Sequence, residues 1–170
     1  MLKTLEYLGR NLLLKLLNRR QLKAAPSFSS PSSILVIRTD PRVGNVIMLT
    51  AFLKEIQLAY PKARLTLLGP AKAKTLLEGS PMLTSLWCFN KKHFVGDDGW
   101  FQTLKRLKRH KFELIIDASN PTSPSTTQTI LSLLGNAPHK LGFGNESAKS
   151  AYTLTAQPLS ADEHENLQRV

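Results

Sequence analysis

One loop of this sequence holds the residue types from which a substrate site is built. Arg38, Asp40 and Arg42 follow an apolar run directly, and Gly44 and Asn45 come next. A carboxylate can accept a proton from a hydroxyl group, and a guanidinium matches the geometry of a phosphate. A glycine lets backbone approach a ligand, and the helix after it offers free N–H groups to an anion. The loop lacks a GxGxxG pattern, so by itself it is a weak nucleotide signal.

A second group of polar residues follows a later apolar run. Asp117 ends that run, and Ser119 and Asn120 come just after it. The carboxyl ends of parallel strands meet at one edge of a sheet, so we expect this group to face the same cleft and to bind hydroxyl groups. The alternative is a local turn and helix cap. For the arginines, the alternatives are a solvated Arg42 and an Arg38 that pairs with Asp40 or a neighbour.

The elements that would position these residues alternate between strands and helices. Short β-branched runs predict strands, and apolar residues at helical spacing predict helices. The predicted strands are residues 34–39, 64–68, 86–89, 113–117 and 140–143, and the predicted helices are 45–60, 71–78, 100–110 and 125–134. We expect Asn45 to cap the first helix. This alternation predicts an α/β class fold, a Rossmann-like parallel sheet with helices on both faces.

Two segments lie before the predicted domain, which covers residues 34–156. Residues 1–23 place leucines on one side of a helix and cations off that side, a basic amphipathic pattern. Such a helix suits an anionic membrane surface, and the alternative is packing on its own domain or on a partner. Residues 24–33 are small, polar and proline-containing, which predicts a linker.

Composition narrows the class of partner. The 170 residues carry a formal charge of +11, which favours nucleic acid, an acidic membrane or a phosphorylated substrate. No helix-turn-helix, RNP-like strand or zinc finger is present, so we expect no nucleic-acid partner. The predicted helix 100–110 groups Phe101 with Leu104 and Leu107 opposite a basic side, which is either solvated or in contact with a membrane or lipopolysaccharide.

Cysteine and histidine usage indicates no metal and no disulfide. Cys88 is the single cysteine, and the four histidines show no ligand spacing. A reducing cytoplasm suits this usage best. No apolar run approaches the roughly 20 residues that a membrane span needs.

Several stretches resemble a known family in the same order along the chain. The segment from Val36 to Thr50 is similar to the strand, Arg-x-Asp-x-x-Gly-Asp-like loop and apolar helix that open the ADP-heptose:lipopolysaccharide heptosyltransferases of glycosyltransferase family 9. The stretches AFLKEIQLAYPKARLTLLG, LLEGSPMLTSLWCFNKK, LKRLKRHKFELIIDAS, APHKLGF and DEHENLQRV resemble later parts of that family. The resemblance covers about residues 34–170.

The resemblance implies a two-domain GT-B enzyme. Its N-terminal Rossmann-like domain receives the acceptor, and its C-terminal domain holds most of the nucleotide-sugar site. This chain would be the N-terminal part, and residues 157–170 would begin the crossover to a missing C-terminal domain. The implied reaction is inverting transfer of a sugar from a nucleotide-diphosphate donor, ADP-heptose, to lipopolysaccharide or a lipid-linked glycan. It needs no cofactor besides this co-substrate, and it would occur at the cytoplasmic face of the bacterial inner membrane.

The sequence departs from the family at the position of the catalytic base. The family's loop ends in Gly-Asp, whereas this chain has Gly44 followed by Asn45, a neutral amide that does not accept a proton usefully. Three interpretations stay open: Asn45 only caps the helix, Asp40 supplies the base, or the protein is a non-catalytic glycan- or anion-binding module or uses another mechanism. The expected acceptor- and phosphate-binding residues are Arg38, Arg42, Gly44, Asp117, Ser119 and Asn120.

Overall fold

The computed structural model describes residues 30–120, 123–143 and 151–156. The expected amphipathic helix 1–23, most of the expected linker 24–33 and the expected crossover 157–170 lie outside the described residues. Ser30, Pro31 and Ser32 are described and lead into the first strand.

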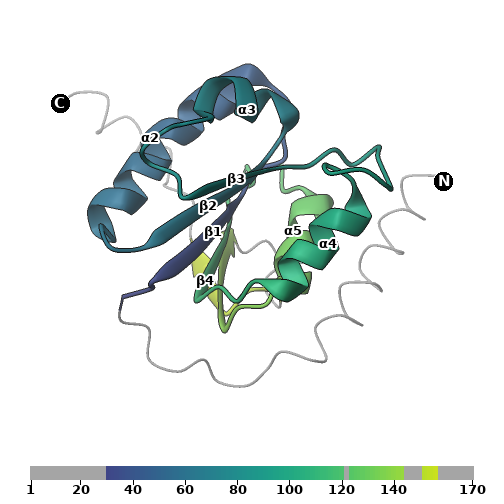
Figure 1. Ribbon diagram of the computed structural model, residues 1–170. Coiled ribbons are helices and arrows are strands. Elements are labelled where there is room, and N and C mark those ends of the chain that lie inside the picture. Colours follow the sequence, from purple (N-terminus) through teal and green to yellow (C-terminus); the bar gives the residue numbers. More distant parts are fainter. Residues whose placement is uncertain (1–29, 121–122, 144–150, 157–170) are drawn as a thin grey trace.

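Within the described residues, six strands form one sheet in the order β3-β2-β1-β4-β5-β6, and every neighbouring pair is parallel (Figure 1). The strands are β1 Ser33–Ile37, β2 Arg64–Gly69, β3 Ser85–Cys88, β4 Leu114–Asp117, β5 His139–Phe143 and β6 Leu154–Ala156. The strand order runs outward from β1 in both directions, so the chain reverses its direction of travel between β1 and β4. The predicted Rossmann-like α/β fold is confirmed.

Helices cover both faces of the sheet (Figure 1). They are α2 Val43–Ala59 and α3 Ala71–Leu77 on one face, and α4 Trp100–Arg109 and α5 Thr126–Leu134 on the other. Successive side chains of a strand point to opposite faces, so Ile34 and Val36 of β1 pack with the first helix pair. Leu35 and Ile37 pack in a second core with α4 and α5. All four side chains are 0% exposed, and this two-sided burial explains why the run is apolar throughout.

The first loop and helix differ from the sequence prediction. Strand β1 ends at Ile37, so Arg38 and Thr39 belong to the loop. Helix α2 begins at Val43, because the carbonyl of Arg42 already accepts hydrogen bonds from the backbone N–H groups of Asn45 (3.1 Å) and Val46 (3.3 Å). The prediction that Asn45 caps this helix is therefore wrong: Asn45 lies inside the first turn.

Strand β6 was not predicted. It has three residues, Leu154–Ala156, and only two of them are partly buried. A segment this short carries no apolar run or alternation that would mark it, and it forms because β5 offers an unpaired edge.

Candidate functional site

A pocket of about 540 Å³ opens at the edge of the sheet where the strands end. Its walls come from the loops after β1, β2, β3 and β4 and from the start of α5. The lining residues are Arg38, Thr39, Asp40, Pro41, Arg42, Pro70, Ala71, Lys72, Phe89, Asn90, Lys91, Lys92, Ser119, Asn120, Ser123, Ser125, Thr127 and Gln128. Because the strand order reverses between β1 and β4, the loops there diverge and leave the crevice in which open α/β sheets bind ligands.

Positive charge dominates the pocket lining. Five cations line it, Arg38, Arg42, Lys72, Lys91 and Lys92, against the single carboxylate of Asp40. A cleft lined by one sign of charge raises the local concentration of oppositely charged ligands. The arrangement therefore suits an anion.

The three lysines were missed by the sequence prediction, although a signal existed. Lys72 follows β2, and Lys91 and Lys92 follow β3, so the same rule that singled out the loops after β1 and β4 applies to them. The strand order explains why these lysines reach the pocket. The switch point is the place between β1 and β4 where the strand order reverses, and β2 and β3 lie on its β1 side and bring their loops to the same pocket.

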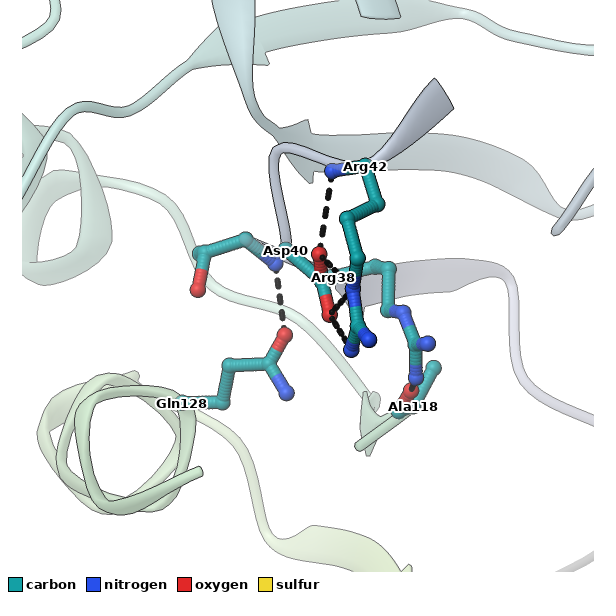
Figure 2. A network of polar contacts seen from close by, with 6 residues as sticks. Arg38, Asp40, Arg42, Ala118 and Gln128 are labelled. Atoms are coloured by element: carbon teal, nitrogen blue, oxygen red, sulfur yellow. Dashed lines mark hydrogen bonds and ion pairs between the residues drawn. The ribbon is translucent and has the colours of Figure 1, made fainter. Parts of the chain in front are cut away.

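Asp40 and Arg42 form an ion pair in the pocket wall (Figure 2). Arg42 Nη2 lies 2.5 Å from Asp40 Oδ2, and Arg42 Nε lies 3.0 Å from Oδ1. The backbone N–H of Arg42 also donates to Oδ1, over 3.0 Å. The side-chain hydrogen bonds from Arg42 hold the pKa of the Asp40 carboxyl well below its usual range, so in this state Asp40 is a weak base.

Arg38 lies in the same loop as this pair, and one of its N–H donors has no partner among the described residues. Its Nη1 donates to the carbonyl of Ala118 (Figure 2), but its Nε is buried without a hydrogen-bond partner among the described residues. A buried donor without a partner costs free energy. Arg38 also lines the pocket, and the group that suits a guanidinium in a mainly cationic lining is an anionic oxygen.

The carboxyl group of Asp117 is bonded inside the fold. Asp117 is 2% exposed and does not line the pocket, which corrects the expectation that it faces the cleft. Its oxygens accept hydrogen bonds from the backbone N–H of Ser119 (3.0 Å), the hydroxyl of Tyr152 (2.5 Å) and Nε2 of Gln128 (3.4 Å). Burial raises the pKa of Asp117, and the hydrogen bonds oppose that rise. The contact with Ser119 is the local turn that the sequence offered as the alternative.

Gln128 connects this buried group to the site loop. While its Nε2 faces Asp117, its Oε1 accepts the backbone N–H of Thr39 over 2.5 Å (Figure 2). Asp117 thus helps to orient the loop that carries Asp40 instead of contacting a ligand. Ser119 and Asn120, predicted together with Asp117, do line the pocket.

Gly44 and Asn45 lie outside the pocket lining. A Cβ atom at Gly44 would meet nothing within 4 Å, so no contact in the fold requires a glycine there. Asn45 is partly buried, and its Nδ2 has no hydrogen-bond partner in the part of the chain that the structure describes. The stretch from Arg38 to Arg42 therefore forms one part of the pocket wall, and Gly44 and Asn45 do not.

Two further findings bear on the chemistry. Among residues 30–120, 123–143 and 151–156, no three His, Cys, Asp or Glu side chains gather where a metal ion would sit. Over the same ranges, no helix has the length and apolar character needed to cross a bilayer. The arrangement on these residues can bind an anion and, once Asp40 is released from Arg42, can take a proton from a hydroxyl group.

Comparison with protein-family models finds no match, and neither does comparison with curated proteins. Among solved structures, the chain is similar to the crystal structure of a glycosyltransferase family 9 protein from Veillonella parvula DSM 2008. The two are 18% identical with a TM-score of 0.63, and the match covers 81% of this chain and 40% of that one. The chain therefore shares the fold of a family 9 glycosyltransferase over two fifths of that protein's length.

Proposed function

We propose that this chain is the acceptor-binding part of a glycosyltransferase of the family 9 kind, and that its pocket receives an anionic, phosphate-bearing acceptor glycan. One observation carries the proposal: a single carboxylate stands among five cations in a pocket at the switch point of the sheet. The fold likeness to a family 9 glycosyltransferase and the order of the family-like stretches support the class of enzyme.

The proposed chemistry is an inverting displacement. Asp40 takes the proton of an acceptor hydroxyl while that oxygen forms a bond to the anomeric carbon of the donor sugar. The bond from that carbon to the nucleoside diphosphate breaks, and the diphosphate leaves with the electron pair. The donor would be ADP-heptose, and most of the groups that stabilise the leaving diphosphate would lie in a second domain.

Substrate binding would itself prepare the base. In the free pocket Arg42 occupies both oxygens of Asp40. A phosphate on the acceptor competes for the guanidinium, which matches phosphate as well as carboxylate. When Arg42 turns to the phosphate, the pKa of Asp40 rises toward its ordinary value, and Asp40 becomes a better proton acceptor. The carboxylate is thus kept inactive until the acceptor is present.

The acceptor would be lipopolysaccharide or a related lipid-linked glycan at the cytoplasmic face of the inner membrane. The basic segment 1–23 would hold the protein there, and nucleic acid would not be a partner. Position 45 would take no part in proton transfer, since Asn45 lies outside the pocket lining.

A non-catalytic binding module is the second candidate. Two observations favour it: Asp40 is paired with Arg42, and the family's base position holds a neutral amide. A protein that binds a phosphorylated glycan without transferring sugar would show both features.

Binding to the purified 170-residue chain tests the pocket. The probe is the phosphorylated core oligosaccharide of lipopolysaccharide, compared with the same oligosaccharide after phosphatase treatment, by calorimetry. We expect Arg38→Gln to weaken binding of the phosphorylated probe about tenfold to a hundredfold, the effect of one lost charge-assisted hydrogen bond. The matched control is Arg64→Gln, an exposed arginine at the start of β2 and so at the opposite sheet edge.

Equal affinity for the two oligosaccharides, or equal weakening by the two arginine variants, would contradict the proposal. The two candidate functions separate in a transfer assay of the intact protein with ADP-heptose, followed by ADP release and by the mass of the oligosaccharide. A mass increase of one heptose supports the enzyme, and tight binding without any mass increase supports the binding module.

A further inference from the structure

An apolar tip stands on the loop between β3 and α4. Phe94 and Val95 are each 77% exposed, and Phe101 in the first turn of α4 is 69% exposed. The sequence grouped Phe101 with Leu104 and Leu107 opposite the basic side of α4. The structure corrects this grouping, because Leu107 is buried and Phe101 is exposed. We call Phe94, Val95 and Phe101 the apolar tip.

The loop that carries this tip is held firmly. Backbone N–H groups of Trp100 and Phe101 donate to the carbonyls of His93 and Phe94, each over 3.0 Å. Asp98 bonds to the ring of His93 over 2.9 Å. Gly99 allows this closure, because a Cβ there would lie 2.7 Å from the carbonyl oxygen of Val95. The closed loop therefore presents its apolar side chains to solvent.

Cations continue from the tip along α4. Lys105, Lys108 and Arg109 are exposed and lie four, seven and eight residues after Phe101, which places all four on one side of the helix. The helix sequence WFQTLKRLKR contains no acidic residue. The surface therefore joins an apolar tip to a basic helix face.

We propose that this surface, the apolar tip with Lys105, Lys108 and Arg109, docks on an anionic lipid bilayer. Aromatic and aliphatic side chains enter the boundary between headgroups and acyl chains, while lysine and arginine remain among the anionic headgroups. Three exposed cations on α4, against the one exposed carboxylate of the loop, Asp97, favour an anionic occupant. Helix α2 also exposes apolar residues, including Ile47, Met48 and Leu58, but it carries only Lys54 next to Glu55 and offers no cationic cluster.

The inference does not depend on the proposed function, since the pocket residues take no part in docking. The two features are nevertheless joined by one loop, because Lys91 and Lys92 line the pocket and Phe94 and Val95 stand at the tip. Docking would therefore bring the pocket close to the lipid surface. The surface is also separate in sequence from residues 1–23, so substitutions distinguish the two.

Flotation of the full chain with lipid vesicles tests the inference. One set of vesicles holds phosphatidylcholine alone, and the other holds equal parts of phosphatidylcholine and phosphatidylglycerol. We expect binding to the second set only. Phe94→Ser with Phe101→Ser should lower the partition coefficient at least about tenfold, and Lys105→Gln with Lys108→Gln should lower it about fivefold for each lysine.

Matched variants on α2 and the loop after it serve as controls. Ile47→Ser with Leu58→Ser removes two exposed apolar side chains, and Lys54→Gln with Lys62→Gln removes two exposed lysines. We expect both control proteins to bind as the wild type does. Circular dichroism checks that all variants fold. We expect them to do so, because the substituted positions are exposed.

Three results would overturn the inference. The first is failure of the wild type to bind anionic vesicles, and the second is wild-type binding by the tip variant. The third is equal loss in the control variants. In the first case, binding of duplex DNA that needs the α4 lysines would identify nucleic acid as the occupant instead.

Discussion

The carboxylate of Asp40 and the guanidinium of Arg42 are joined at two points in the pocket wall, Nη2 to Oδ2 over 2.5 Å and Nε to Oδ1 over 3.0 Å. Only Pro41 lies between them in sequence, so the contact forms within one short loop. Arg42 is largely exposed, with 74% of its side chain accessible, whereas Asp40 retains 23%. The side chain of Arg42 can therefore rotate toward a ligand while the carboxylate of Asp40 stays in place.

Replacing the arginine should release the carboxylate. We expect Arg42→Gln to raise the pKa of Asp40 toward its ordinary value near 4, because the hydrogen bonds that favour the charged form are lost. A carboxyl-detected NMR titration measures this directly. In the wild type the lowered pKa means that the pair stabilises the fold above about pH 4 and loses that contribution as the pH falls further. Arg64→Gln is the control, and an unchanged Asp40 titration in Arg42→Gln would contradict the pairing.

In the proposed reaction, loss of the Asp40 carboxylate should reduce sugar transfer strongly and the stability of the fold little. Asp40→Asn keeps the size of the side chain but accepts no proton, so we expect turnover to fall by about a hundredfold to ten-thousandfold. Turnover and thermal unfolding are measured on the same samples. Asp97→Asn, at an exposed carboxylate outside the pocket lining, should behave as wild type. Wild-type turnover in Asp40→Asn, together with higher turnover in Asn45→Asp, would assign the position of the proton acceptor to residue 45 and not to residue 40.

Two glycines should respond oppositely to alanine. A Cβ at Gly142 would lie 2.5–2.7 Å from ring atoms of Tyr152, so Gly142→Ala must move the ring whose hydroxyl bonds to Asp117. We expect a loss of about 1–3 kcal/mol in the free energy of unfolding. At Gly44, in the first turn of α2, a Cβ meets open space, and alanine should stabilise by about 0.5–1 kcal/mol. Denaturant unfolding measures both, and a neutral Gly142→Ala would disprove the close contact.

A buried lysine should make the free energy of unfolding depend on pH. Lys140 is 0% exposed, its Nζ donates to the carbonyl of Leu133 over 2.8 Å, and burial lowers its pKa to about 8. An unfolded lysine titrates near 10.4, so between about pH 8 and 10 the unfolded chain binds more protons and the free energy of unfolding rises with pH. Lys140→Met should remove this rise.

The exposed Lys54→Met is the control for that measurement and should keep the rise. Unfolding by guanidinium chloride at a series of pH values gives the slope for each protein. Identical slopes in wild type and Lys140→Met would show that Lys140 is not the group responsible.

Much of the fold could be predicted from local patterns. The run around Ile34 to Ile37 is apolar throughout because its side chains are buried on both faces of the sheet, and Pro61 and Gly135 mark helix ends within two residues. Alternation of such elements is enough for a parallel α/β class. It was not enough for the short strand β6, nor for the start of α2, where hydrogen bonds to the carbonyl of Arg42 begin the helix before Asn45.

The sequence by itself determined the order of the elements, the excess of positive charge and the loop chemistry of Arg38, Asp40 and Arg42, because these depend on neighbours along the chain. Only the tertiary structure decided which loops share a pocket. It brought Lys72 and Lys91 into the same pocket as Asp40 and turned Asp117 inward to bond with Tyr152. The physical reason is that strand order and the packed side of each helix result from contacts between segments far apart in sequence, which no local pattern encodes.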